Sequence, residues 1–191
     1  MLPAFRSFGA TDCQAVATPR FYPTTDPPKF QPSSHLHGQR FLGYNSDIIN
    51  TRSVTMIKQI NHDEGFLKRK AVKATRQDAE VVADLMDTLR ANQERCVGMA
   101  ANMIGVNKRI IAVQMGILSV PMINPEITKK SDPYTAKEGC LSLVGQRSAK
   151  RYGTIEVTFL DQKFQKHTQT FSDFIAQTIQ HEIDHCNGII I

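Results

Sequence analysis

Two histidines placed four residues apart close to the C-terminus constrain this chain more than any other feature. Residues 180–185 read QHEIDH, so His181 and His185 share one helix face and can bind one metal ion. Glu182 is rotated by about 100° from His181, which puts its carboxylate beside the ion, where it can accept a proton from water. The same spacing also occurs in helices whose histidines bind nothing. Six residues follow His185, and none is Asp, Glu or His. A third ligand therefore has to come from an earlier part of the chain.

Several earlier side chains could supply this third ligand. They are cysteines and histidines: Cys13, Cys96, Cys140, His62 and His167. Both histidines stand in polar sequence that predicts exposure to solvent, and Cys13 lies in a proline-rich stretch. Cys140 is favoured over Cys96, because it follows a glycine in KEGCLSL and glycine permits the close backbone approach that a metal site needs.

The first 55 residues differ in composition from the rest. They hold six of the nine prolines and show no helical or alternating apolar pattern. Residues 1–55 are therefore expected to be a disordered or non-native extension, and residues 56–191 a single domain. The low acidic content of the extension is also typical of organelle-targeting peptides, but the amphipathic arginine-rich helix of such peptides is missing. We expect a cytoplasmic protein, because neither a secretory signal nor a membrane-spanning apolar run is present.

Residues 56–191 mix helical and strand patterns, as in an α+β protein. Apolar residues at helical spacing predict one helix after Thr75, capped by Thr75 and Asp78, and a second helix from Ser172 to Gly188. Short apolar or alternating runs predict strands at 109–115, 119–124, 153–161 and 166–172, the last two paired across a turn near Gln162.

Three segments resemble, in order and spacing, the signature blocks of peptide deformylases. They are CVGMAANMIG at 96–105, EGCLS at 138–142 and QHEIDH at 180–185, and the opening at 56–71 is also similar to the usual start of that family. The resemblance covers residues 56–191. It implies an α+β fold with small, mostly antiparallel sheets around a C-terminal metal-binding helix.

The resemblance also implies a role for each matching residue. Cys140, His181 and His185 would bind the metal, and Glu182 would be the general acid and base. The backbone N–H of Leu141 would donate to the developing oxyanion. The family removes the formyl group from N-formylmethionyl nascent peptides, usually with Fe²⁺. Zn²⁺ can occupy the same site, and Ni²⁺ or Co²⁺ suits the same ligands.

The first block implies the substrate-binding residues Val97, Gly98 and Met103, but it departs from the family pattern. Cys96 replaces a glycine, and Met103 replaces a glutamine whose amide is expected to hydrogen-bond the reacting oxygens. A thioether cannot donate, and the loss of one oxyanion donor typically costs about 10² to 10³ in rate. The neighbouring amide of Asn102 would replace it only if the backbone shifted.

These observations leave more than one reading open. The leading one is a metal-dependent peptide deformylase, with activity reduced by Met103. The alternative is a non-catalytic metal-binding homologue, and a zinc endopeptidase is disfavoured by the missing downstream ligand. The deformylase reading implies a monomer near the ribosome, with no membrane and no direct nucleic-acid specificity.

Three further sequence expectations bear on the site. Glu138 is a candidate partner for Arg147 or Arg151, which would orient the cysteine loop. Asp184 is expected to be a helix-surface charge. The sequence ends three residues after Gly188, where family members commonly continue, so part of the cleft support is expected to be missing.

Overall fold

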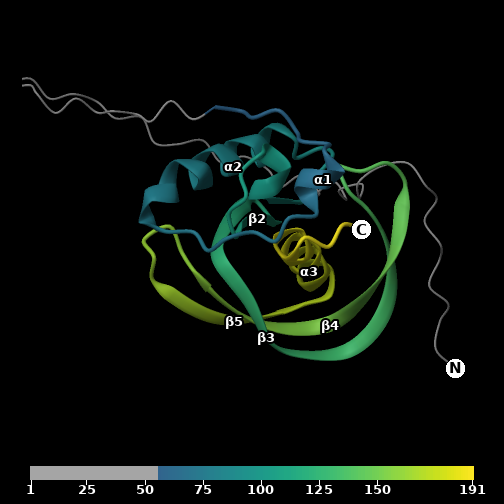
Figure 1. Ribbon diagram of the computed structural model, residues 1–191. Coiled ribbons are helices and arrows are strands. Elements are labelled where there is room, and N and C mark those ends of the chain that lie inside the picture. Colours follow the sequence, from purple (N-terminus) through teal and green to yellow (C-terminus); the bar gives the residue numbers. More distant parts are fainter. Residues whose placement is uncertain (1–55) are drawn as a thin grey trace, which may run out of the picture. The chain divides into compact units, whose positions relative to one another are not determined.

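A five-stranded antiparallel sheet in the order β1-β2-β3-β4-β5 curves around the C-terminal helix α3 (Figure 1). The structure is a computed structural model and describes residues 56–191. The elements in chain order are α1 (Glu64–Leu67), η1 (Arg76–Asp78), α2 (Ala79–Ala91), β1 (Gly98–Ala100), η2 (Ala101–Ile104), β2 (Ile110–Met115), β3 (Leu118–Gly139), β4 (Gln146–Leu160), β5 (Lys166–Ser172) and α3 (Asp173–Asn187). The predicted α+β class is confirmed. The N-terminal extension and Cys13 lie outside the described residues, so the domain boundary stays a prediction.

Strands β3 and β4 are longer than the sequence predicted. The expected strand at 119–124 is only the beginning of β3, which runs 22 residues to Gly139, and β4 begins at Gln146 rather than near 153. The added parts are polar and mostly exposed, so hydrophobic patterning could not reveal them; pairing between β3 and β4 holds them together. Because β3 and β4 pair along their full length, the structure has one five-stranded sheet in place of the small sheets that were expected. Strand β3 ends at Gly139 and so leads directly into Cys140.

Both predicted helices are present: the first begins after Thr75 as η1 and continues as α2, and the second is α3, within the predicted range. The Thr75 backbone N–H donates to the Asp78 carboxylate at 2.7 Å, which caps the η1–α2 segment. Helix α3 begins after Ser172 and ends at Gly188, whose φ of 74° is the left-handed conformation favoured by glycine. A Cβ at position 188 would also collide with the carbonyl oxygen of Lys68, so this end of α3 packs closely on the segment after α1.

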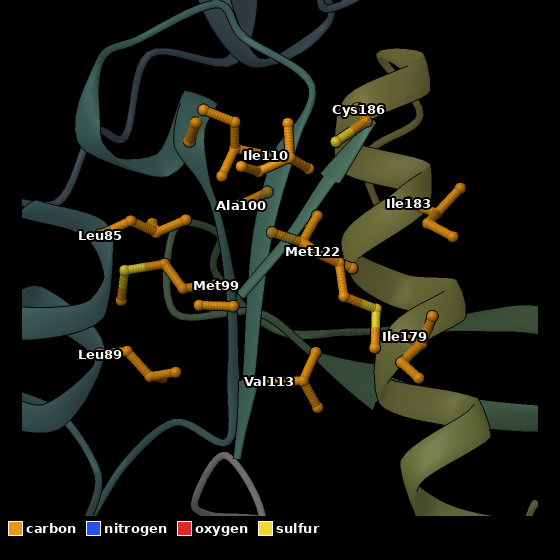
Figure 2. Packing of buried hydrophobic residues seen from close by; sticks show 14 of the residues in the cluster. Leu85, Leu89, Met99, Ala100, Ile110, Val113, Met122, Ile179, Ile183 and Cys186 are labelled. Carbon is orange, nitrogen blue, oxygen red and sulfur yellow. The ribbon is translucent and has the colours of Figure 1, made fainter. Parts of the chain in front are cut away.

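The hydrophobic core places α2 and α3 on opposite sides of β1 and β2. Figure 2 shows Leu85 and Leu89 of α2 on one side, Ile179 and Ile183 of α3 on the other, and Met99 between them. All of these side chains are buried. The same packing buries Cys186. Because the apolar face of α3 is buried against the sheet, the helix cannot rotate about its axis. The position of the residues on its opposite face is therefore fixed as well.

The predicted β4–β5 hairpin is confirmed. Thr154 to Leu160 pair with Ser172 to Lys166, and the chain turns at Asp161–Gln165. Among residues 56–191, no helix combines the length and apolar character needed to cross a membrane.

Candidate metal centre

The structure brings Cys140, directly after β3, together with His181 and His185 of α3. Their candidate ligand atoms all lie within 4.8 Å of one another. Cys140 Sγ is 3.2 Å from His185 Nε2, and the two imidazole ring centroids are 5.2 Å apart. The histidines come from one face of α3, whereas Cys140 comes from the loop after β3. One sulfur and two nitrogen donors form the kind of set that binds Zn²⁺ or Fe²⁺ and leaves a fourth position for water or substrate.

A chain of charged groups behind the site fixes the orientation of His181. Its Nδ1 lies 2.9 Å from Glu138 Oε2, so Nδ1–H donates to the carboxylate and Nε2 is left for a metal. Arg151 donates to both oxygens of Glu138, at 2.8 and 2.7 Å, and to Asp184 at 2.7 Å. Of the two expected partners of Glu138, Arg151 is the one found. The expectation for Asp184 was wrong: its side chain is 19% exposed and paired with Arg151.

These contacts set the charges of the ion-pair chain. Burial raises the pKa of Glu138, but the hydrogen bonds from His181 and Arg151 outweigh it and hold that pKa at about 2. Burial also lowers the pKa of Arg151, and its two carboxylate partners more than offset this. Both groups are therefore ionised at neutral pH.

The cavity beside this row of ion-paired residues favours a positive charge on His181. Burial lowers the pKa of His181, but the neighbouring Cys140 and Glu138, together with Glu182, raise it to about 10. Burial, followed by repulsion from His181, lowers the pKa of His185 to about 3, so this imidazole stays neutral. The ionised Glu138 carboxylate thus favours a cation at His181. A divalent ion can take the place of that proton.

Glu182 is buried in the same cavity and has an unused oxygen. The residue is 3% exposed, and no residue among 56–191 hydrogen-bonds to Oε2. Burial raises its pKa to about 7, against the opposing charge of His181. A carboxyl group with a pKa near neutrality can both accept and release a proton.

Gly98 permits the close packing of β1 on α3 at this point. A Cβ at position 98 would lie 2.6 Å from both Glu182 Oε1 and Thr178 Cγ2. Glycine therefore lets strand β1 and the carboxylate share the cavity wall.

The described residues fit a divalent metal ion. The three donors converge, one imidazole is oriented by a carboxylate, and the buried Nδ1 of His185 and Oε2 of Glu182 have no partner within residues 56–191. Buried polar atoms without partners are rare in folded proteins and often mark a place for water or an ion.

The cavity lining contains seven of the eight sequence-predicted site residues. Its walls come from β1 and the residues just before it, η2, the end of β3, the loop after β3 and α3: Cys96, Val97, Gly98, Met103, Glu138, Gly139, Cys140, Leu141, Gln177, Thr178, His181 and Glu182. The eighth, His185, is next to the lining, with Nε2 3.2 Å from Cys140 Sγ. Asn102 is buried, and its amide donates to the backbone oxygens of His185 and Leu67. That amide is therefore turned away from the position that a glutamine at 103 would use.

Two supporting contacts were not predicted from the sequence. The Gln180 side chain hydrogen-bonds both backbone groups of Tyr152 and so fastens α3 to β4. His62 is exposed as expected, but its ring lies 3.1 Å from the Ser142 carbonyl in the loop after Cys140. Both contacts join residues far apart in sequence, which local patterning does not register.

Residues 54–191 are similar in sequence to known peptide deformylases. The polypeptide deformylase family model matches residues 54–191. The peptide deformylase of Clostridium beijerinckii is 60% identical over 136 residues, which are 71% of this chain and 100% of that protein. The peptide deformylase of Thermoanaerobacter pseudethanolicus is 33% identical over 128 residues, or 65% of this chain and 79% of that one.

Solved structures show the same similarity in three dimensions. The Met-Ala-Ser-bound class I type b peptide deformylase of Acinetobacter baumannii superposes with a TM-score of 0.63 at 25% identity, covering 71% of this chain and 96% of that one. Peptide deformylase from Thermotoga maritima gives a TM-score of 0.65 at 25% identity, covering 71% and 95%.

Proposed function

The chain belongs to the polypeptide deformylase family, and on that premise we propose that its cavity removes the formyl group from N-formylmethionyl peptides. The single observation that carries this proposal is the buried Glu182 carboxylate beside the Cys140, His181 and His185 cluster. Glu182 supports a hydrolase over a non-catalytic metal protein, because binding an ion does not require it.

Cys140, His181 and His185 would hold the ion, with Glu138 fixing His181. A divalent ion held there would acidify water and polarise a carbonyl group. Glu182 accepts a proton from the water whose oxygen attacks the formyl carbon, and delivers it to the amine nitrogen as the C–N bond breaks. The products are formate and a free N-terminal amine. The backbone N–H of Leu141 is the proposed donor to the carbonyl oxygen during this step.

The peptide would lie along the outer edge of β1. This strand is at the edge of the sheet, and the Val97 carbonyl accepts from Gln114 on the β2 side. Because backbone groups alternate along a strand, Gly98 and Ala100 direct theirs away from β2. Gly98 also lines the cavity, so an extended peptide pairing with its backbone would place its N-terminus near Glu182. Val97, Gly98 and Met103 are the proposed peptide-binding residues.

We propose Fe²⁺ as the working ion, with Zn²⁺, Ni²⁺ or Co²⁺ able to replace it on the same ligands. The donor set suits all four ions. Metal analysis of protein purified without oxygen tests this part: iron near one per chain supports it, and another metal at that ratio contradicts it. The proposed setting is a cytoplasmic monomer acting on nascent chains near the ribosome.

The function is tested by anaerobic deformylation of formyl-Met-Ala-Ser by the Fe²⁺-loaded full chain. We expect formate release in proportion to bound metal, and loss of both metal and turnover in Cys140→Ser. Wild-type protein that binds one metal per chain and releases no formate would instead favour the non-catalytic homologue. Retention of full metal binding by Cys140→Ser would mean that Cys140 is not the third ligand.

A further inference from the structure

The chain just before helix α1 contacts two of the segments that line the cavity. The Asn61 N–H donates to the carbonyl oxygen of Met103 at 2.7 Å, and the Asn61 side-chain amide donates to that of Asn102 at 3.3 Å. His62 reaches the loop after β3, where its Nδ1 lies 3.1 Å from the carbonyl oxygen of Ser142. Because a carbonyl oxygen can only accept, Nδ1 carries the hydrogen and donates it. Two consecutive residues therefore connect η2 and the loop after β3 to the same piece of backbone.

The loop after β3 carries two groups with a proposed role in the reaction, the sulfur of Cys140 and the backbone N–H of Leu141. Ser142 follows them directly and is held from two sides. Its N–H points to Cys140 Sγ, with the nitrogen 3.4 Å from the sulfur, and its carbonyl oxygen accepts from His62. Because Leu141 lies between Cys140 and Ser142, the position of its N–H depends on both of these anchors.

We propose that His62 is a positioning residue that holds the Leu141 N–H in place through the Ser142 carbonyl oxygen. This inference rests on the proposed function, because it takes the Leu141 N–H as the donor to the oxyanion. His62 is not among the residues that line the cavity, so it acts through Ser142 and not on the substrate. Without this hydrogen bond the loop is free to shift relative to η2, and a donor stabilises the transition state only at the right distance.

The backbone around His62 is well anchored, so it can restrain a loop. The Asp63 carboxylate caps helix α1, with Oδ1 accepting from the N–H groups of Gly65 and Phe66 at 2.8 and 3.2 Å. Leu67, at the end of α1, is fully buried. His62 itself is exposed, so replacing its side chain removes little packing. A substitution at this position can therefore test the hydrogen bond without unfolding the domain.

The test compares His62→Ala with His62→Asn in the Fe²⁺-loaded full chain, without oxygen. The Nδ2 of asparagine stands the same number of bonds from Cα as the Nδ1 of histidine, so asparagine can keep the donor that alanine removes. We expect His62→Ala to lower kcat for formyl-Met-Ala-Ser about three- to tenfold, as for the loss of one hydrogen bond, with KM within about twofold of the wild-type value. His62→Asn should restore kcat. A wild-type kcat in His62→Ala, or equal losses in both variants, would overturn the role of His62.

Hydrogen exchange in the Zn²⁺-loaded full chain tests the same contact without turnover. The Leu141 and Ser142 amides should exchange about three- to tenfold faster in His62→Ala than in the wild type or His62→Asn. The amide of Ile111, which is buried in β2, should keep its rate. Faster exchange at Ile111 as well would mean general destabilisation and would contradict a local role.

His167→Ala is the matched control. His167 is also exposed and hydrogen-bonds the Asp161 carboxylate at 2.9 Å, but it lies in β5 and not beside the loop after β3. Its removal should leave kcat and the exchange rates of that loop unchanged, and an effect as large as that of His62→Ala would overturn the proposal. A metal-loaded wild type that releases no formate would contradict the proposed function itself, and the exchange rates would still decide whether His62 holds the loop. Normal turnover with unchanged kcat and exchange in His62→Ala would remove only this inference.

Discussion

The two walls of the cavity are built from different kinds of interaction. The helix wall, formed by α3 with Glu138 and Arg151, holds its side chains through charge-assisted hydrogen bonds of 2.7 to 2.9 Å. The strand wall, formed by β1 and η2, contacts the Met103 thioether only weakly, with Met103 Sδ 3.4 Å from the Ala100 nitrogen. Charged buried groups are costly to leave unpaired, whereas a thioether contact is easily exchanged. The helix wall should thus control metal binding and proton transfer, and the strand wall should control peptide binding and rate.

The largest expected effect is on the helix wall. Glu182→Gln keeps the size of the side chain but cannot accept the proton, so kcat for formyl-Met-Ala-Ser should fall by about 10² to 10⁴. Metal content should be unchanged, because Glu182 is not one of the three proposed ligands. Formate release and metal analysis on the same sample check this. Loss of metal together with activity would show that the two roles are not separate.

The next effect is on the strand wall. Met103→Gln introduces an amide donor into the cavity, and kcat should rise by about 10² to 10³ if the missing oxyanion donor limits the wild type. Met103→Leu is the matched control, since it keeps the volume and adds no donor, and its kcat should stay near that of the wild type. A glutamine variant no faster than the leucine variant would refute this explanation.

Arg151→Met tests the ion-pair chain behind the helix wall. It leaves Glu138 and Asp184 without their shared partner, which should lower the free energy of unfolding by about 3–5 kcal/mol and weaken metal affinity about 10- to 100-fold. Chemical denaturation and metal competition titration measure these changes. The control is Lys129→Met, in an ion pair whose lysine side chain is 77% exposed, where solvent screening leaves little change in stability. Similar losses in both variants would mean that burial of the pair is unimportant.

The smallest effect is a pH dependence in the metal-free protein. The pKa of Glu138 lies at about 2 in the folded protein, below its usual 4.5, so its ionised form stabilises the fold. That stabilisation is fully present above pH 4.5 and is lost as the pH falls from 4.5 toward 2. Denaturation of wild type and Glu138→Gln should therefore give a difference in stability that shrinks over this window. A difference independent of pH would show that Glu138 acts only through packing.

Much of the site could be predicted because its strongest signals are local. The four-residue spacing of His181 and His185 on a capped helix needs no tertiary information, since helical geometry alone puts them on one face. The resemblance then selected Cys140, and the structure brings its sulfur to these histidines. The polar halves of β3 and β4 were missed, because their order comes from pairing with each other rather than from an apolar pattern.

By itself, the sequence determined which residues can do chemistry: the histidine pair, Glu182 between them, and the sulfur residues that replace the usual ones at 96 and 103. Only the tertiary structure decided how they are supported and approached. Asp184 turned out to pair with Arg151, and Asn102 to face away from the cavity. Met103 Sδ lies against the N–H of Ala100, which faces away from β2. The physical reason is that charge pairing, burial and access depend on residues distant in sequence, which meet only when the sheet closes around α3.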